Sequence, residues 1–235
     1  MKIILSPSKE MAFEKSIDKK IELNEISQKI LDEIKKMTKA ELQKKLKVSD
    51  KIIDEVYGYY QDFDENPAYY AIDMYRGMAF KEIDFGAEDD FARDHVIILS
   101  AFYGPLRVDD VVRPYRLDFN VSLKVNNLSL KKLWADYYNY YFKKDERILN
   151  LASDEFSSLL KRDDFDFIDF DFYEFRDGNI KRHSTISKKL RGKMANFIVK
   201  NKITNLDYLK DFNENGFVYD KENSNDKLYV FKRDV

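Results

Sequence analysis

The sequence predicts a single mixed α/β domain, of the α+β kind, in which helices surround a twisted mixed sheet. Short apolar runs rich in β-branched residues at 2–6, 96–102 and 147–153 have the length and composition of buried strands. Apolar residues with helical spacing fill 24–62 and 129–142. A chain of 235 residues can bury one sizeable core, so we assign 1–235 to a single domain.

The composition excludes several classes of function. The chain contains no cysteine, which rules out disulfides, thiolate metal sites and a cysteine nucleophile within it. Hydrophobic residues make up 44% and charged residues 36%, and no apolar run approaches the roughly 18 residues that a membrane span needs. The formal net charge of −2 gives no overall basic field. We therefore expect a cytoplasmic protein with no membrane partner, on which any basic surface is local.

The first predicted strand, 2–6, runs directly into a polar loop. Ser6, Ser8 and Lys9 stand at the end of an apolar strand, a position where ligands often bind. Their hydroxyl and ammonium groups suit a phosphate, although the glycine-rich pattern of a P-loop is absent. A loop that merely ends the strand explains the same residues.

Residues 24–62 predict a cluster of short helices with a lysine-rich face. Such a face is typical of solvated helices, and paired short helices also bind nucleic-acid backbones. The segment 68–80 predicts a further helix that ends near Gly77. Arg76 lies beside that glycine, and a surface or ion-paired arginine is the favoured interpretation.

The stretch 99–119 combines arginines with glycine and proline turns. It is predicted as the end of a strand, a tight turn at Gly104, a short helix that Pro105 opens and Pro114 ends, and a second strand. Guanidinium groups offer paired planar donors that suit phosphates and carboxylates. An anion-binding surface and structural ion pairs both remain open here. The arginines are Arg107, Arg113 and Arg116, and the neighbouring aspartates are Asp109, Asp110 and Asp118.

Polar side chains also follow the predicted strand at 147–153. Ser153, Asp154 and Glu155 suit the start of a helix, and capping explains all three without a function. The same residue types at the end of a strand can supply a general base or a metal ligand. The capping interpretation is favoured.

Residues 164–175 alternate acidic and aromatic side chains, which predicts one bulged strand or two short ones. The dipeptide at 177–178 predicts a hairpin turn into a strand at 179–186. Only two histidines occur, His95 and His183, in unrelated contexts, so we predict no metal site and no cofactor. The alternation places the acidic side chains first on a solvent face, although carboxylates also suit hard metals; they are Asp164, Asp166, Asp169 and Asp171.

A basic helix is predicted from 187 to 202. Lysines near a helix N-terminus oppose the helix dipole, so a bound anion is one source of compensation. Gly192 would let another backbone or a ligand approach closely. This helix is the second candidate anion-binding segment, and its basic residues are Lys188, Lys189, Arg191 and Lys193.

Several blocks in fixed order resemble the YaaA family of peroxide stress proteins, over essentially the entire chain. The matching blocks are ILSPSK, LSAFYGPLR, RPYRLDF, Leu133 with Trp134, NLASDEF, KKLRGKM, FNENGFVYD and VFKR. The resemblance implies a cytoplasmic bacterial protein of mixed α/β fold that helps to limit free iron during hydrogen peroxide stress. It also implies DNA binding in a positively charged cleft with a helix-hairpin-helix-like element, to which LSAFYGPL is similar.

Three functions are considered. The first is a DNA-binding stress protein that contacts the phosphate backbone of duplex or branched DNA with little dependence on sequence. The second is an enzyme that acts on a nucleotide or another phosphorylated small molecule in the same cleft, although no catalytic motif is identified. The third is direct iron sequestration by the acidic strand, which the alternation and the lack of cysteine disfavour.

The residues assigned to these functions form two sets. The candidates for binding DNA or phosphate are Lys9, Arg76, Arg107, Arg113, Arg116, Lys188, Lys189, Arg191 and Lys193. The candidates for a polar cleft are Ser6, Ser8, Ser153, Asp154 and Glu155.

Overall fold

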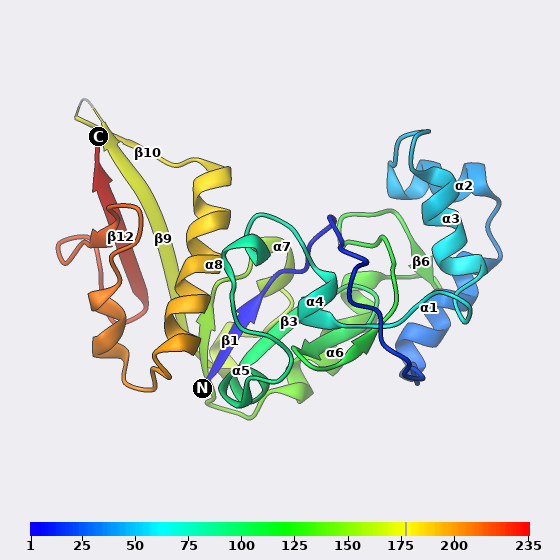
Figure 1. Ribbon diagram of the computed structural model, residues 1–235, viewed down its shortest axis with the longest axis horizontal. Coiled ribbons are helices and arrows are strands. Elements are labelled where there is room, and N and C mark those ends of the chain that lie inside the picture. The colour runs from blue at the N-terminus through cyan, green and yellow to red at the C-terminus, as the bar shows by residue number, and fades with distance from the viewer. Residues whose placement is uncertain (177) are drawn as a thin grey trace.

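A central mixed sheet organises the fold, and the mixed α/β class predicted from the sequence is confirmed (Figure 1). The computed structural model describes residues 1–176 and 178–235. Within them, eight strands form one sheet in the order β11-β12-β9-β8-β1-β3-β4, with β10 paired to β9. These strands are β1 (Lys2–Leu5), β3 (Val96–Ser100), β4 (Gly104–Arg107), β8 (Arg147–Asn150), β9 (Asp166–Arg176), β10 (Asn179–Lys181), β11 (Val218–Tyr219) and β12 (Leu228–Asp234).

Five neighbouring strands, β3, β1, β8, β9 and β12, are parallel, and the antiparallel strands β4 and β11 flank them. The carboxyl ends of the parallel strands therefore lie along one edge of the sheet, the carboxyl edge, and their starts lie along the amino edge. Ile3, Ile4 and Leu5 of β1 are at most 1% exposed. An uninterrupted apolar run is expected for a parallel strand that is covered on both faces.

The connections from the two central strands lead in opposite directions. The chain that leaves β1 next joins the sheet at β3, whereas the chain that leaves β8 joins it at β9, on the other side. Loops that diverge in this way leave a crevice outside the carboxyl ends, which is the usual ligand position in open α/β sheets. The switch point between β1 and β8 therefore determines where a cleft can form.

Helices and short strands surround this sheet. The helix α8 packs against β9 and against the short helix η1, and α6 packs against β4. The remaining strands form two small pairs, β2 (Tyr69–Tyr70) with β5 (Val111–Val112) and β6 (Lys124–Val125) with β7 (Leu128–Ser129). The helices are α1 (Glu25–Lys35), α2 (Lys39–Leu46), α3 (Ile53–Gln61), α4 (Ala71–Met74), η1 (Phe80–Glu82), α5 (Asp90–His95), α6 (Leu130–Tyr141), α7 (Asp154–Ser157), η2 (Arg162–Asp164), α8 (Ser184–Lys200) and η3 (Leu206–Asp211).

Residues 99–107 form a β-hairpin, so the helix expected after Pro105 and the helix-hairpin-helix assignment of this segment are wrong. Ser100 pairs with Gly104 and Leu99 pairs with Pro105 between β3 and β4. The tight turn expected at Gly104 is present, with φ of +85°, and a Cβ there would lie 2.6 Å from Trp134. Packing against this buried tryptophan fixes the turn, and β4 is an edge strand, where proline is tolerated.

Other predicted elements differ in extent. In place of one helix, the segment 68–80 contains strand β2, the short helix α4 and the start of η1, and 117–125 is irregular until β6. The acidic stretch forms one continuous strand, β9. The strand predicted at 179–186 ends at Lys181, so α8 begins earlier than predicted, at Ser184. The predicted hairpin pairs Arg176 with Asn179, but Asp177 of its turn lies outside the described residues.

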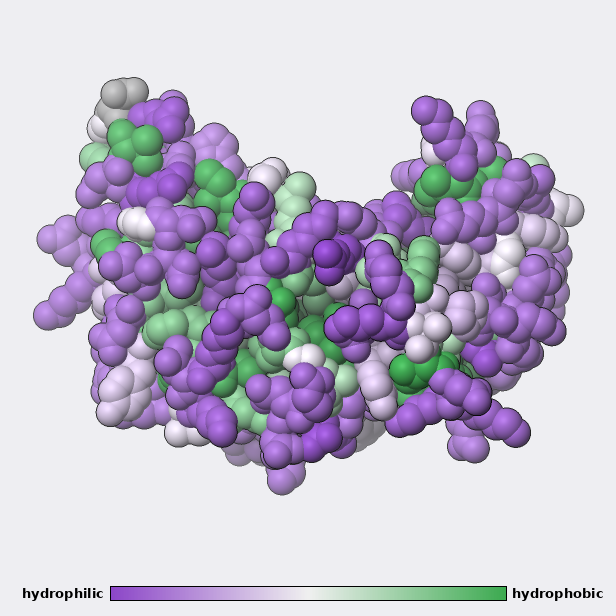
Figure 2. All heavy atoms as spheres, in the orientation of Figure 1, coloured by the Kyte–Doolittle hydropathy of each residue, from purple (hydrophilic) through white to green (hydrophobic). Residues whose placement is uncertain are grey.

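The molecule has two raised ends with a hollow between them (Figure 2). One end carries β10, the end of β9 and the start of α8, and the other carries α2 and α3. Hydrophilic residues cover most of both ends on the face that Figure 2 shows. None of the helices in the described ranges is long and apolar enough to cross a membrane.

Candidate functional site

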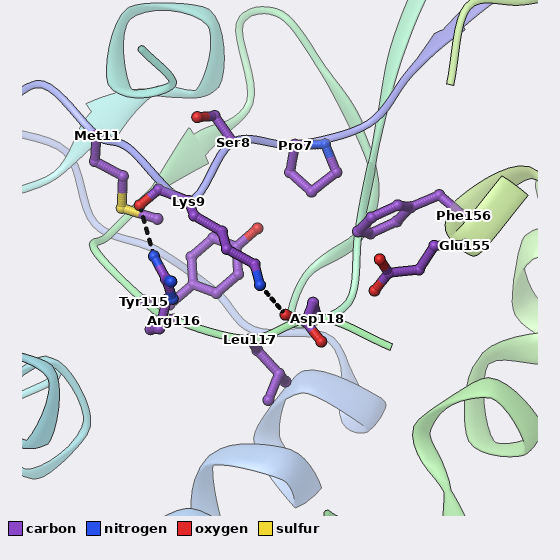
Figure 3. Close-up of a pocket in the computed structure, with 10 residues that line it drawn as sticks. All are labelled: Pro7, Ser8, Lys9, Met11, Tyr115, Arg116, Leu117, Asp118, Glu155 and Phe156. Atoms are coloured by element: carbon purple, nitrogen blue, oxygen red, sulfur yellow. Dashed lines mark hydrogen bonds and ion pairs between the residues drawn. The ribbon is translucent and has the colours of Figure 1, made fainter. Parts of the chain in front are cut away.

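A cleft of about 360 Å³, lined by both apolar and polar side chains, opens at the carboxyl edge, between the loops that follow β1 and β8. We call it the switch-point cleft. A smaller hollow of about 50 Å³ lies beside it and shares with it Pro7, Ser8, Lys9, Glu155 and Phe156 (Figure 3). The switch-point cleft is lined by Leu5, Ser6, Pro7, Ser8, Lys9, Glu10, Gly77, Met78, Ala79, Phe80, Leu151, Ser153, Glu155, Phe156, Lys188 and Arg191.

Two serines join the ends of the central strands. The backbone N–H of Ser153 donates to Oγ of Ser6 at 2.8 Å, and the two hydroxyl oxygens are 3.1 Å apart. Ser153 stands at the N-cap of α7, but its side chain makes no capping hydrogen bond. The capping interpretation therefore fails for the Ser153 hydroxyl, which is paired with the Ser6 hydroxyl at the cleft.

Residues 77–80 form another wall of the cleft, held by two close approaches, one to the Ser8 side chain and one between backbones. A Cβ on Gly77 would lie 2.3 Å from Oγ of Ser8, and a Cβ on Gly192 of α8 would lie 2.0 Å from the carbonyl oxygen of Ala79. Only glycine permits contacts of this kind without displacement. The wall is thus clamped between the loop after β1 and helix α8.

On the side of the smaller hollow, the charged groups are paired. Nζ of Lys9 lies 2.6 Å from a carboxylate oxygen of Asp118, and Nη1 of Arg116 donates to the carbonyl oxygen of Lys9 at 3.1 Å (Figure 3). The Glu155 carboxylate accepts the N–H of Phe119 at 2.9 Å. Burial, together with the nearby Asp118, raises the pKa of Glu155. A carboxyl group with a raised pKa is a candidate proton carrier.

On the side of α8, the cations are unpaired. Within residues 1–176 and 178–235, Lys188 forms no ion pair, and no nitrogen of Arg191 forms a hydrogen bond or an ion pair. The Nε of Arg191 is buried. Burial lowers the pKa of Arg191, and more distant aspartates only partly oppose that effect. The arrangement can therefore accept an anion.

Comparison with known proteins decides the family. The model of the peroxide stress protein YaaA family matches residues 1–223. The chain belongs to this family. Among its relatives are UPF0246 proteins of Fusobacterium nucleatum, 34% identical over 99% of both chains, and of Crocosphaera subtropica, 36% identical over 98% of this chain and 99% of its own. A UPF0246 protein of Streptococcus agalactiae is 32% identical over 98% of both chains.

The resemblance seen in the sequence is thus confirmed, and the structure shows which predicted residues of this family member meet. Ser6, Ser8, Lys9, Ser153, Glu155, Lys188 and Arg191 line the switch-point cleft, and Arg116 lines the adjoining hollow. Asp154 is exposed outside these linings. The functional roles of all these residues remain predictions.

The other predicted phosphate-binding residues lie elsewhere. Arg113 donates to the carbonyl oxygen of Phe63 at 2.8 Å and is 14% exposed, so it holds the fold together. Arg107 lies at the amino edge and pairs with Asp109. Lys193 pairs with two glutamates, Glu82 and Glu214. Arg76 and Lys189 are exposed and line none of these hollows.

Carboxylates of the acidic strand β9 form ion pairs with neighbouring basic side chains. Asp166 pairs with Arg147 and Lys227, Asp169 with Arg162, and Asp171 with Arg182. Asp164 is exposed in η2. In the described part of the chain, no three histidine, aspartate or glutamate side chains are grouped to hold a metal ion.

Sequence reasoning missed the wall at 77–80. Its exposed Met78, with 42% of its surface accessible, is the apolar side of the cleft. The available signal was the pair of glycines, Gly77 and Gly192, one in a loop and one inside a helix. Isolated glycines inside regular elements often mark close approach of another backbone.

Proposed function

We propose that this member of the peroxide stress family binds DNA through the phosphate backbone, across the hollow between its two raised ends. The family supports the physiological setting. The observation that carries the proposal is that both ends carry lysines without an ion pair in the described ranges. They are Lys188 and Lys189 on α8, and Lys44, Lys45, Lys47 and Lys51 around α2 and α3.

The helix pair at one end supports backbone binding. The helices α2 and α3 contact each other, and a capping box of Thr38 and Glu41 starts α2. Between the helices, Lys47 has a left-handed conformation with φ of +53°, flanked by the buried Leu46 and Val48. The buried pair anchors the turn and leaves the intervening lysine exposed. A tight turn of this kind can present both a lysine and backbone N–H groups to a phosphate.

Fluorescence anisotropy tests the proposal, with a closed duplex that has no strand ends and a branched DNA as ligands. Because each neutralised phosphate releases counterions, we expect affinity to fall steeply between about 50 and 200 mM salt. We expect the Lys188→Gln, Lys189→Gln double variant to bind about tenfold more weakly and with a shallower salt dependence.

The matched control is Lys143→Gln with Lys144→Gln, after α6 near the amino edge. It removes the same charge from a part of the surface outside the hollow, so its affinity should equal that of the wild type. A second test pair, Lys44→Gln with Lys47→Gln, probes the other raised end. Absence of wild-type binding at low salt, or equal losses in the control and both test variants, would refute the proposal.

The physiological part of the proposal is that DNA binding limits oxidative DNA damage and free iron during exposure to hydrogen peroxide. A strain that lacks the protein should accumulate more DNA breaks and more chelatable iron after a peroxide pulse. The wild-type gene should restore both quantities, whereas the Lys188→Gln, Lys189→Gln variant should not. Full restoration by a variant shown not to bind DNA would separate the stress role from DNA binding.

A second candidate function is an enzyme that acts on a nucleotide or another phosphorylated small molecule in the switch-point cleft. The specific observation in its favour is that Glu155, whose pKa is raised, lines the same cleft as the unpaired Arg191. Proton transfer near a bound anion uses this combination. Phosphorus NMR of nucleotides incubated with the wild type and with Glu155→Gln would detect turnover that depends on this carboxyl group.

A further inference from the structure

The switch-point cleft has the size of a site for one small molecule. Its volume of about 360 Å³ lies in the range of small-molecule pockets and is far too small for a duplex. The close approach of Gly192 to the backbone of Ala79, together with that of Gly77 to the Ser8 side chain, holds one wall of the cleft. The cleft is therefore preformed, with a position that the strand topology determines.

Its cationic end is formed by Lys188 and Arg191, which line the same cleft three residues apart on α8. The buried Nε of Arg191 has no hydrogen-bond partner in the described structure. Buried donors are normally satisfied, and a guanidinium group is satisfied best by an oxyanion. Two further arginines, Arg113 and Arg233, also have a buried and unpartnered Nε, but their other nitrogens bind Phe63 and Glu174. Arg191 lacks even that second contact within the described residues.

The other full charges around the cleft cancel in pairs. Glu10 lies 2.7 Å from Lys81, and Lys9 lies 2.6 Å from Asp118. What remains is the positive charge of Lys188 and Arg191, opposed by more distant aspartates and by the Glu155 carboxyl group, which accepts the N–H of Phe119. Two positive charges match a phosphate monoester, which carries a charge of about −1.5 to −2 at neutral pH.

The paired serines supply a donor for such a group. Oγ of Ser6 already accepts the N–H of Ser153, and only one hydroxyl hydrogen can lie between the two oxygens. Whichever serine donates to the other, the second hydroxyl hydrogen is left to donate into the cleft. The exposed side chain of Met78 offers an apolar surface on the opposite wall.

We propose that the switch-point cleft binds a phosphate monoester of nucleotide size, with its phosphate on Lys188, Arg191 and the free serine hydroxyl and its base against Met78. The inference deepens the second candidate function, but it concerns binding and requires no turnover. The same chemistry has two sources, a free nucleoside monophosphate and a 5′-phosphate at the end of a DNA strand.

Isothermal titration with the four ribonucleoside 5′-monophosphates and the matching nucleosides tests the proposal. We expect at least one monophosphate to bind, about tenfold more tightly than its nucleoside. Arg191→Gln should lose about tenfold in affinity for that monophosphate, whereas Lys144→Gln, an equal charge change after α6 and outside the cleft, should lose nothing. Equal binding of nucleoside and monophosphate, or equal affinity of the two variants, would overturn the proposal.

Oligonucleotides separate the two sources. If strand ends are the ligand, a 5′-phosphorylated oligonucleotide binds more tightly than its 5′-hydroxyl form, in an Arg191-dependent way, while free monophosphates bind weakly. Failure of both the monophosphates and the phosphorylated end to bind would refute the site. The closed duplex used above has no monoester, so loss of its binding would count against DNA binding alone.

Thermal unfolding first establishes that each variant is folded. If Arg191→Gln does not fold, the exposed Lys188→Gln takes its place against Lys144→Gln. These two variants remove equal charge from exposed lysines, and only Lys188 lines the cleft. The proposal then requires that Lys188→Gln binds the monophosphate more weakly than the wild type and that the control variant does not.

Discussion

Two hollows of similar size lie at opposite edges of the sheet, and their cations are in different states. The amino-edge hollow, of about 320 Å³, includes Lys2, Arg93, Arg107 and Lys143 in its lining. Lys2 donates to the carbonyl oxygen of Asp94 at 2.5 Å, the two arginines pair with aspartates, and the exposed Lys143 forms no ion pair within the described residues. The switch-point cleft instead contains Arg191, whose Nε is buried, and the exposed Lys188, and neither side chain has a hydrogen-bond or ion-pair partner among the described residues.

The difference shows that the presence of an arginine does not identify an anion-binding site. What distinguishes the two hollows is whether the arginine already has an ion-pair partner in the fold. Arg107 and Arg191 were both candidates in the sequence, each within three residues of a glycine, and the aspartates beside Arg107 offered an ion pair as the alternative. In the folded chain Arg107 donates to Asp109, two residues away, at 3.3 Å. Arg191 has no hydrogen-bond or ion-pair partner among the described residues, so a direct partner must come from a ligand or from solvent. We expect the following three changes to test this contrast.

The largest effect is expected from Gly192→Ala, which places a Cβ against the preformed wall of the switch-point cleft. The new Cβ would lie 2.0 Å from the carbonyl oxygen of Ala79, so α8 and residues 77–80 must move apart. We expect a loss of about 2 kcal/mol in the free energy of unfolding, the usual cost of overpacking. Urea unfolding measures it.

The matched control is Gly58→Ala in α3, where the nearest atom to a new Cβ is 3.7 Å away. Because alanine favours helix more than glycine does, this variant should be as stable as the wild type or about 1 kcal/mol more stable. Equal stability of the Gly192→Ala and Gly58→Ala variants would show that the wall yields easily and is not preformed.

A smaller effect of opposite sign is expected from Arg191→Met. A buried donor without a partner destabilises the free protein, so removing it should raise the free energy of unfolding by about 1 kcal/mol. Arg107→Met at the amino edge should change stability by less than about 0.5 kcal/mol, because it removes one exposed ion pair. Chemical unfolding without added phosphate compares the two. A destabilised Arg191→Met variant would mean that the guanidinium group has a structural role.

The sequence was sufficient for the strands that build the cleft and for the polar residues at their ends. The runs that became β1 and β8 are short, apolar and followed by serine, and both runs were predicted as strands. Parallel pairing then necessarily brings Ser6 and Ser153 to the same edge. Local pattern succeeds here because burial on both faces of a strand leaves a clear apolar signal.

The rest depended on contacts between residues far apart in the chain. Gly104 and Pro105 suit a helix start as well as a hairpin, and only packing against Trp134 selects the hairpin. The carbonyl group that holds Arg113 belongs to Phe63, fifty positions earlier. No local sequence pattern identifies partners that are so distant in the chain. The sequence could therefore propose arginines for an anion site, but it could not show that Arg113 is held by the fold and that Arg191 is not.

The smallest effect is a difference in pH dependence between the two edges. At the carboxyl edge, burial and Asp118 raise the pKa of Glu155 above its ordinary value of 4.5, so its ionisation opposes folding. At the amino edge, the hydrogen bond from Lys227, aided by Arg147, lowers the pKa of Asp166 below 3.8, so its ionisation favours folding. Replacing each acid by its amide should therefore change stability in opposite directions at neutral pH.

Glu155→Gln should gain stability relative to the wild type as the pH rises from 4.5 through the folded pKa, because the penalty is absent below that window. Asp166→Asn should be less stable than the wild type at neutral pH, and the deficit should shrink as the pH falls below 3.8 through the folded pKa. Both differences should stay under about 1 kcal/mol, since the groups are only partly buried. Urea unfolding from about pH 3 to pH 8 measures them. The same sign for both variants at neutral pH would contradict the contrast, because the carboxylates of the two edges would then have equivalent environments.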